Sequence, residues 1–566
     1  MSKFLFIIIL IVNLYSDEKW NKLLHHYNGE NQIVSNEFYL TNNINSTSKE
    51  ELKKTVKLLN SKFGEKIACN FPARYNYLKS NNYNIQNFDL SKCNKLNDFI
   101  ENFNKDKVSI VFTSEYTNSP SSAFGHTMLL FSDDNKSLNI GDAVHFVAKT
   151  NNKDGFFKYA NKGLNGSYNG YFLREPFFKK IYEYNTLEQR YMYIYTLDFS
   201  KKQILQLLYH LFELRKATFK YYFLDGNCAS QTTDLLNIVN DKYRKDSIYY
   251  LPINAVQNYE RNIIKKTRFI PLINKLTLLL DKMTSKEKIL FNQIIKNNLQ
   301  VTKNMPDIVK EAMVYYSTFY FRKFHRVYKN YNAIMKQNYQ KQIIKDNSLE
   351  PLEKTKPSNI GLGLYTQNNT NYLYLRYRPL FIDMFDIQLN SLQESEIDIF
   401  TFDFIANEKN SKLLKFNFLN IKSFSTQSNF YKPMSWAIYS GINRNNKDNS
   451  IKFNNEIGFG KTFSALKSST VNMLLYFGND NSDIYIKPYF NINTYLSNNS
   501  KIGISTYYKK YDGDNYYNNR IFISYKYDNL LYSLEYNKDN NTYNEKYMFS
   551  IKYNFWLTSI YCKIID

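Results

Sequence analysis

The chain has 566 residues, which is too long for a single domain with one hydrophobic core, so roughly two to four domains are expected. Its formal net charge of +23 at pH 7 would suit nucleic acid or an anionic membrane surface. Lysine is spread from end to end, however, without a basic arm or a nucleic-acid-binding motif. No nucleic-acid partner is therefore expected, and a lipid surface is favoured.

The N-terminus has the pattern of a secretory signal. Lys3 precedes an apolar run over residues 4–12, and Ser16 stands before two acidic residues. The run is shorter than the about 20 apolar residues that a membrane-spanning helix needs. Residues 1–16 are therefore predicted to be a signal peptide of an exported protein. No later apolar stretch is long enough to span as a helix, so a membrane form would need a barrel.

Residues 17–105 are predicted to be a small, mostly helical domain. Apolar side chains recur there at helical spacing in two places: Trp20, Leu23, Leu24 and Tyr27, and Leu52, Val56, Leu58 and Leu59. The domain also holds Cys69 and Cys93. In an oxidising compartment the two thiols could form a disulfide, but the sequence does not show whether they meet.

Residues 106–254 change to short strands followed by helices. Strand-like apolar segments occupy residues 108–112, 127–131, 140–148 and 191–197. A helical pattern follows at 203–216, and a further helix is expected to begin at or just after Cys228. The mixture predicts an α+β domain, and the sharp chemical motifs of the chain lie within it.

Residues 255–350 are predicted to be a helical spacer. Thr284 and Glu287 have the spacing of a capping box ahead of apolar residues at helical intervals. The segment is basic and carries no recognisable chemical motif. It is therefore interpreted as structural support.

Residues 357–566 are predicted to be all-β. Tyr532, Leu534 and Tyr536 alternate with polar neighbours, which gives each strand one apolar and one polar face. About a dozen such segments, separated by Asn, Asp, Gly and Lys turns, predict an antiparallel β-barrel of about 12 strands. An outer-membrane barrel is favoured, and a soluble β-sandwich or lipid-free barrel is the alternative.

Two histidines are expected to face one another in a hairpin. His126 begins one predicted strand, within Ser121-Ser-Ala-Phe-Gly-His126-Thr127, and His145 lies in the next. A turn centred near Asn135 would place the two residues opposite each other, with Cβ atoms about 5 Å apart. One imidazole could then orient the other, which is the arrangement that a base needs when it activates a cysteine.

Cys228 stands at the predicted start of a helix, within Asp225-Gly-Asn-Cys228-Ala-Ser230. The helix dipole and free backbone N–H groups favour a thiolate there, and the same N–H groups can hold an oxyanion. Cys228 is therefore the candidate nucleophile, with His126 as base and His145 as orienting residue. Each also has a purely structural explanation, as a small buried cysteine or a hydrogen-bonded core histidine.

Other catalytic templates do not occur in the sequence. It has no G-x-S-x-G elbow and no H-E-x-x-H zinc helix. Gly458-Phe-Gly-Lys-Thr462 imitates the end of a phosphate loop, but Asn455 stands where the first glycine should be. No metal and no organic cofactor is expected. The remaining histidines are assigned no role: His25, His26, His210 and His325.

Three segments together resemble the periplasmic domain of Lnb-type lipoprotein N-acyltransferases: S-P-S-S-A-F-G-H-T-M-L-L-F (119–131), G-L-N-G-S-Y-N-G-Y-F (163–172) and Y-Y-F-L-D-G-N-C-A-S (221–230). The likeness covers roughly residues 108–250. It implies a circularly permuted papain- or NlpC-like fold in which the histidine precedes the cysteine, with Cys228 as nucleophile and His126 as base. His145 stands where relatives often carry another polar residue. The acyltransferases continue into membrane helices, whereas this chain continues into strands.

By this resemblance the chain would be a thiol-dependent acyltransferase or acyl hydrolase acting on lipid or lipoprotein in the bacterial envelope. The barrel would lie in the outer membrane and the catalytic domain in the periplasm. Because NlpC-like folds also cleave peptides, a peptidoglycan amidase or peptidase is an alternative. A non-catalytic scaffold anchored by the barrel is a third interpretation.

Overall fold

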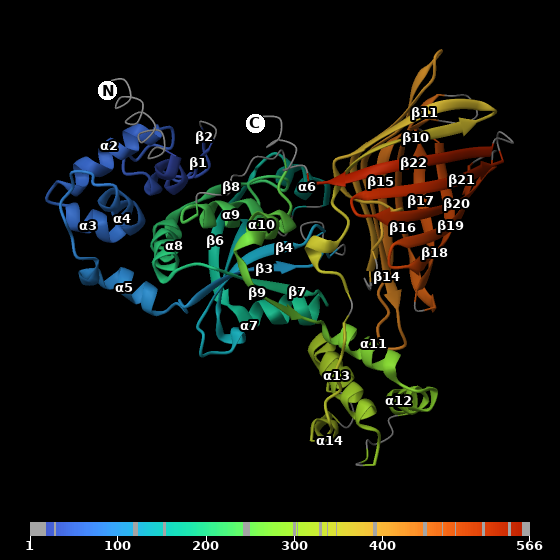
Figure 1. Cartoon of the computed structure of the whole chain (residues 1–566), viewed down its shortest axis with the longest axis horizontal. Coiled ribbons are helices and arrows are strands. Elements are labelled where there is room, and N and C mark those ends of the chain that lie inside the picture. The colour runs from blue at the N-terminus through green and yellow to red at the C-terminus, as the bar shows by residue number, and fades with distance from the viewer. Residues whose placement is uncertain are drawn as a thin grey trace. The chain divides into compact units, whose positions relative to one another are not determined.

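The computed structural model (Figure 1) describes residues 18–27, 30–116, 123–150, 154, 156–240, 249–297, 302, 304–327, 331–336, 338–346, 348–388, 393–444, 450–466, 468–481, 483–511, 515–540 and 545–556. The predicted signal peptide, residues 1–16, lies outside this part of the chain. The chain divides into two compact units, residues 1–345 and 346–566.

Short helices form the N-terminal part of the first unit: α2 (Ser48–Leu59), α3 (Gly64–Asn70), α4 (Pro72–Ser80) and α5 (Asn94–Glu101). A capping box starts α2, because Thr47 and Glu50 each accept a hydrogen bond from the other's backbone N–H. Pro72 takes the first position of α4, where the N–H that proline lacks would have no partner inside the helix. Local sequence therefore sets these helix starts.

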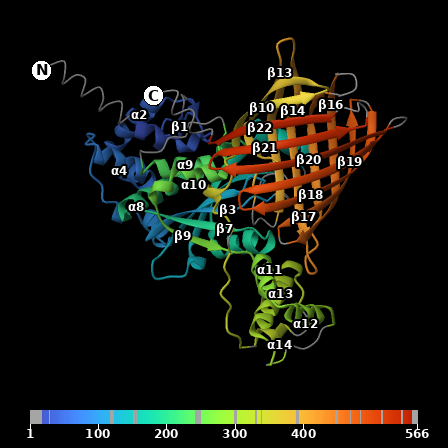
Figure 2. The same ribbon diagram turned by 45° about the vertical axis from the view of Figure 1, so that its right-hand side comes forward.

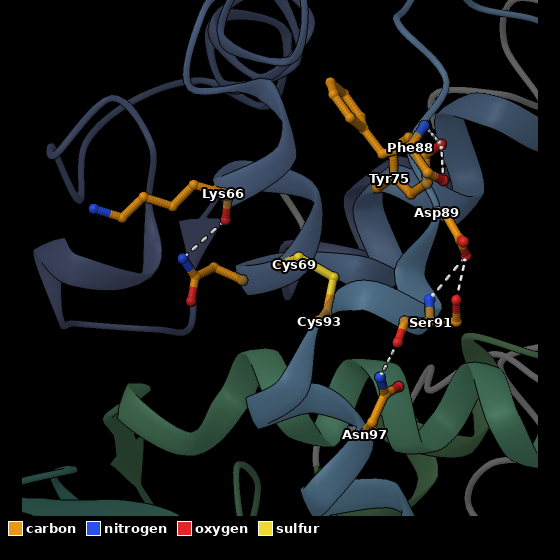
Figure 3. Close-up of a disulfide and its surroundings, with 9 residues drawn as sticks. Lys66, Cys69, Tyr75, Phe88, Asp89, Ser91, Cys93 and Asn97 are labelled. Carbon is orange, nitrogen blue, oxygen red and sulfur yellow. Dashed lines mark hydrogen bonds between the residues drawn. A yellow bond between two sulfur atoms is a disulfide. The ribbon is translucent and has the colours of Figure 1, made fainter.

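A disulfide between Cys69 and Cys93 joins α3 to the turn before α5, as Figure 3 shows. The two Cα atoms are 5.4 Å apart. The pairing that the sequence left open is therefore made in the structure. A cross-link of this kind typically stabilises a fold by about 2–4 kcal/mol, mainly by restricting the unfolded chain.

Arg74 ties the N-terminal helices to α8 (Lys201–Glu213). Its guanidinium is fully buried and lies 3.0 Å from Glu51 on one side and 3.4 Å from Glu213 on the other. Glu213 also accepts hydrogen bonds from the backbone N–H groups of Ala73 and Arg74. A buried charge is stable only when paired in this way, so these contacts fix where the N-terminal helices pack.

A seven-stranded antiparallel sheet forms the centre of the first unit. In spatial order its strands are β8 (Phe219–Tyr221), β6 (Tyr168–Pro176), β5 (Asp142–Lys149), β4 (His126–Ser132), β3 (Lys107–Thr113), β7 (Met192–Leu197) and β9 (Ile263–Phe269). The edge strand β9 falls within the segment predicted to be a helical spacer, and this part of the prediction is wrong. Its apolar alternation is weak because none of its side chains is fully buried, but its backbone pairs with β7.

Helices cover both faces of this sheet, as Figure 1 shows. On one face, α9 (Cys228–Asn237) packs against β4 and β5, and α10 (Pro252–Asn258) packs against β3 and β4. On the other, Phe177 of α7 (Phe177–Lys180) and Tyr184 of the π-helix η5 (Ile181–Leu187) join a core with apolar residues of the strands. The start of β4 therefore lies between two layers.

The rest of the first unit is helical and comprises α11 (Leu272–Lys282), α12 (Ser285–Asn297), α13 (Asp307–Phe324) and α14 (Tyr331–Met335). Thr284 and Glu287 form the predicted capping interaction, in which each accepts a hydrogen bond from the other's backbone N–H. Among the described residues, no helix has both the length and the apolar character needed to cross a membrane.

The second unit is a closed antiparallel barrel of twelve strands: β10 (Ser358–Gln367), β11 (Thr370–Arg378), β13 (Gln393–Ala406), β14 (Ser411–Gln427), β15 (Ser435–Arg444), β16 (Ile451–Leu466), β17 (Ser469–Asp480), β18 (Asp483–Ser497), β19 (Ser500–Lys510), β20 (Asn515–Tyr527), β21 (Leu530–Asp539) and β22 (Glu545–Phe555). Figure 2 shows several of these strands side by side. Pairing of β10 with β22 and of β11 with β13 closes the barrel, so the predicted barrel is confirmed.

The period of two in the sequence matches the two faces of the barrel wall. Leu534 is 55% exposed, whereas its neighbour Ser533 is 2% exposed and faces inward. Tyr525 and Ser524 repeat this pattern on β20, at 48% and 1%. Apolar and aromatic side chains thus cover the outside, and polar ones line the lumen.

Candidate functional site

The residues singled out in the sequence lie at the ends of neighbouring elements in the first unit. His126 is the first residue of β4, His145 lies in β5, and Cys228 is the first residue of α9. Ser121 and Ser122, which precede His126 in its motif, lie outside the described residues. The expected strand–strand–helix arrangement is therefore present.

The register of the β4–β5 hairpin differs from the one predicted. Leu129 pairs with Val144 and Phe131 with Asp142, so this register sets position 126 against 147, two residues beyond His145. A 3-10 turn, η4 (Leu138–Ile140), lengthens the connection, which explains the shift. The two histidines still share a face because the offset is even. They are diagonal neighbours, with ring centroids 6.1 Å apart and the rings nearly perpendicular.

The thiol of Cys228 lies against the start of β4. The backbone N–H of Thr127, the residue after His126, donates a hydrogen bond towards its sulfur, and so do the N–H groups of Cys228 itself and Ala229. Thr127 also donates its hydroxyl to the carbonyl oxygen of Pro252 at 2.7 Å. Backbone contacts from a strand and from a helix start therefore hold the sulfur beside Thr127, the residue that follows His126.

Asn227 fixes the helix that carries the thiol. Its side-chain oxygen accepts hydrogen bonds from the N–H groups of Ala229 at 2.9 Å and Ser230 at 3.2 Å, as an N-cap residue does. Its amide nitrogen donates to the carbonyl oxygen of Tyr250 at 2.7 Å. The first-turn N–H groups are therefore not all free, contrary to the prediction, and the Ser230 N–H is committed to the cap.

Burial keeps Cys228 protonated. It raises the pKa of the thiol to about 11, although the surrounding N–H groups and the positive charge of Arg190 act in the opposite direction. The thiolate that a helix N-terminus was expected to favour is therefore not the resting state. The N–H groups at the helix start do lower the pKa of the thiol, but burial raises it by more, because a thiolate away from water is poorly solvated.

His126 is a neutral imidazole with an unsatisfied nitrogen. Burial, His145, Arg190 and Lys180 together hold its pKa well below the ordinary value. Its Nε2 is buried and has no hydrogen-bond partner. The thiol is consequently not hydrogen-bonded to this nitrogen, although the two groups belong to adjoining parts of the site.

His145 is held by a carboxylate. Its Nε2 lies 2.9 Å from Glu175 of β6, and Glu175 also pairs with Lys180 at 2.7 Å. The lysine and His145 hold the pKa of Glu175 below its usual value, against the effect of burial, so the carboxylate is ionised. An ionised carboxylate can only accept hydrogen bonds, so the imidazole nitrogen that contacts it must be the donor. The proton of the neutral His145 ring is therefore on Nε2.

Arg190 and Tyr184 complete the site and were not predicted from the sequence. Arg190 is 1% exposed and donates to the carbonyl oxygen of Ser114 at 2.7 Å and to the hydroxyl of Thr113 at 2.6 Å. Its guanidinium lies 5.0 Å from the centre of the Tyr184 ring, which is 5.7 Å from that of His126. No motif or spacing marks these residues, because folding alone brings η5 to the start of β4.

Comparisons with known proteins assign three parts of the chain to families. Residues 95–262 match the family described as the Lnb N-terminal periplasmic domain. Residues 12–81 and 349–553 match two families described as domains of unknown function, DUF7843 and DUF7840. No curated protein matches the chain.

Among solved structures, outer-membrane proteins are similar to part of the chain. The KdgM porin is 11% identical, and the match covers 35% of this chain and 99% of the porin with a TM-score of 0.24. The outer membrane protein Omp33 of Acinetobacter baumannii is 8% identical, with 36% and 100% covered and a TM-score of 0.23.

The family match agrees with the resemblance seen in the three sequence segments, and it includes β3 to β8 and α9 with all three candidate residues. The closed barrel has an apolar outer face and a polar lumen, as an outer-membrane barrel does. Residues 95–262 therefore match the Lnb N-terminal periplasmic domain, within an exported protein of the outer membrane that also contains a twelve-strand barrel.

Proposed function

We propose that the Lnb domain of this protein transfers or hydrolyses acyl groups of envelope lipids or lipoproteins through Cys228 and His126. The observation that carries the proposal is the pairing of an orphaned, buried imidazole nitrogen on His126 with a buried thiol bonded to the next residue's N–H. An imidazole nitrogen that has no hydrogen-bond partner is available to accept a proton from the neighbouring thiol.

In the first half of the reaction, His126 takes the proton of the Cys228 thiol as the sulfur attacks an ester carbonyl carbon. The resting thiol and the neutral imidazole are the correct protonation states for this step. His126 must first approach the thiol, since its Nε2 has no hydrogen-bond partner at rest. The oxyanion that forms is met by the N–H groups that surround the sulfur.

Collapse of the tetrahedral intermediate breaks the ester bond. The leaving alcohol takes the proton from His126, and the acyl group stays on Cys228 as a thioester. An amine or a water then attacks the thioester carbon while His126 accepts its proton, and that proton returns to the sulfur as the thioester breaks. An amine acceptor gives transfer and water gives hydrolysis.

The class of substrate follows from the location of the protein. A domain tied by its own chain to an outer-membrane barrel remains close to phospholipids and lipoproteins, whose acyl esters suit a thiol nucleophile. The high effective concentration of a tethered domain also favours a membrane-bound substrate.

The proposal is tested with the full-length protein in vesicles that contain a phospholipid with a labelled acyl chain and a diacylated lipopeptide with a free N-terminal amine. The wild type should move label to the amine or release it as fatty acid. Cys228→Ala and His126→Gln should lose this activity, and Cys562→Ala, which removes a different thiol, should keep it. Undiminished activity in Cys228→Ala would refute the proposal. If these variants instead lose cleavage of peptidoglycan stem peptides by the wild type, the amidase interpretation is favoured.

A further inference from the structure

The segment between β11 and β13 folds into the lumen of the barrel. It starts with the short strand β12 (Leu380–Ile382), which pairs with β13. Beyond this strand, Asp383, Met384 and Phe385 line the same internal cavity as the inward-facing residues of the barrel wall. The connection is thus an internal element of the barrel.

Phe385 reaches the wall on the far side from β13. Its ring lies 4.9 Å from that of Phe522 on β20, and its carbonyl oxygen accepts a hydrogen bond from Ser524 at 2.8 Å. The ammonium of Lys552 on β22 lies 3.7 Å from the centre of its ring. Around the closed barrel, β22 is separated from β13 by β11 and β10, and β20 lies two strands further on, so the contacts with β20 take the segment across the lumen.

Gln388 makes a second crossing in another direction. Its backbone N–H donates to the hydroxyl of Tyr495 on β18 at 3.2 Å. Its side chain exchanges hydrogen bonds with the backbone of Ser395 on β13. Together with Phe385, it connects the segment to three separate regions of the wall.

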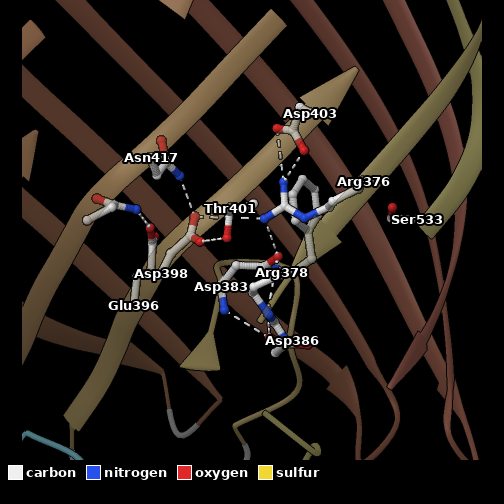
Figure 4. A network of polar contacts seen from close by, with 12 residues as sticks. Arg376, Arg378, Asp383, Asp386, Glu396, Asp398, Thr401, Asp403, Asn417 and Ser533 are labelled. Atoms are coloured by element: carbon white, nitrogen blue, oxygen red, sulfur yellow. Dashed lines mark hydrogen bonds and ion pairs between the residues drawn. The ribbon is translucent and has the colours of Figure 1, made fainter. Parts of the chain in front are cut away.

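Buried ion pairs hold the segment in place, as Figure 4 shows. Arg376 on β11 lies 3.0 Å from Asp383 and 2.8 Å from Asp403 of the neighbouring strand, β13. Arg378 is fully buried and pairs with Asp386, whose carboxylate also accepts from the N–H of Asp383 at 2.8 Å. Removing one member of such a group would leave an uncompensated buried charge, so the segment is firmly fixed.

The cavity extends from this segment to the opposite end of the barrel. It has a volume of 1110 Å³ and is also lined by Arg444, Lys452 and Asp483, which lie at hairpin ends remote from Arg378. The segment itself occupies the end at which the barrel strands begin, at Ser358, and finish, at Phe555. The chain enters the barrel at this end after the first unit, whose residues 95–262 match a family described as a periplasmic domain, so we assign this end to the periplasm.

We propose that residues 379–388 are a resident plug that closes the periplasmic end of the lumen. The barrel then acts as a membrane anchor containing an outward-opening chamber, and it is not a channel for ions or small solutes. Most lysines on the chamber wall are paired with carboxylates, as Lys422 is with Glu396 at 2.9 Å. The positive and negative charges of the wall therefore largely cancel, and no strong electric field draws ions through the lumen.

Conductance of the full-length protein in planar lipid bilayers tests the plug. The wild type should show no stable open steps at high salt. A variant with residues 383–387 replaced by a Gly/Ser linker should gain stable steps, provided that its barrel is folded, as judged by resistance to SDS before heating. Stable steps in the wild type would overturn the proposal, and so would a folded, plug-less variant that stays closed.

Two single substitutions test the same proposal in case the variant with the Gly/Ser linker does not fold. Asp386→Asn removes the carboxylate that pairs with Arg378 and should produce intermittent opening. Asp480→Asn, which removes the partner of Lys509 at 3.0 Å at the other end of the lumen, should stay closed like the wild type. Equal behaviour of these two variants would contradict the assignment of Arg378 and Asp386 as the anchor.

Discussion

The imidazole of His145 donates a hydrogen bond from Nε2 to the carboxylate of Glu175 at 2.9 Å, while its ring stands edge-on to that of His126. Glu175 therefore contacts His145, and His145 in turn contacts His126, the proposed base. We propose that His145 orients His126 through this ring contact, since its Nε2 is engaged by Glu175.

Glu175→Gln should therefore slow acyl transfer about tenfold with little change in KM, because His145 would lose its ionised acceptor and its fixed tautomer. The measurement is steady-state kinetics of the vesicle assay across a range of pH. Glu183→Gln is the matched control, since Glu183 also pairs with Lys180 at 2.7 Å but is not hydrogen-bonded to His145. Equal losses in both variants would assign the effect to Lys180.

Asn227→Ala should destabilise the Lnb domain by about 2 kcal/mol, because the cap of α9 is lost and the carbonyl of Tyr250 loses a buried donor. The measurement is the shift of the first thermal unfolding transition of the full-length protein in detergent. Ser200→Ala removes the exposed capping box of α8 and should cost only about 1 kcal/mol. A larger shift for Ser200→Ala would show that the buried contacts of Asn227 contribute little.

Cys228 should react slowly with small alkylating reagents at neutral pH. With the pKa of its thiol raised to about 11 by burial, the reactive thiolate grows about tenfold per pH unit over the neutral and mildly alkaline range. Mass spectrometry after timed alkylation gives the rate at each pH. A rate that levels off near pH 8.5, the ordinary thiol value, would mean that the site is wetter than the structure indicates.

The first unit should lose stability as pH falls below about 6.5, the ordinary pKa of histidine. Burial lowers the pKa of His210 in the folded state, so the unfolded chain binds a proton that the folded one does not. His210 contacts His25 at 3.0 Å and lies near Glu213 and Arg74. Unfolding free energy should fall by up to about 1.4 kcal/mol per pH unit for this group.

His210→Gln should reduce this pH dependence while still allowing a hydrogen bond to His25. The measurement is the thermal midpoint of wild type and variant at about pH 5 and pH 8. His26→Gln is the control, because His26 is only partly buried and bonds to Asn31 at the surface of the same region. An unchanged slope in His210→Gln would assign the acid sensitivity to other groups.

Local patterns predicted much of this structure, and long-range packing accounts for what they missed. Alternation as in Ser533 and Leu534 predicted the barrel, and the motifs around His126 and Cys228 predicted the domain and its elements. The sequence could not reveal the burial that raises the thiol pKa, nor the carboxylate of Glu175 behind His145, since both depend on distant elements. The turn at Leu138–Ile140 shifted the predicted register for a similar reason: its length is set by packing.

The central claim is that Cys228 carries the acyl group during the reaction. Full-length protein is mixed with phospholipid vesicles without any acceptor, quenched in acid and digested, and the peptide containing Cys228 is examined by mass spectrometry. We expect a fatty-acyl thioester on Cys228 in the wild type that hydroxylamine removes, and none in His126→Gln. An acyl group found elsewhere, or none on Cys228 while lipid is still consumed, would contradict the account.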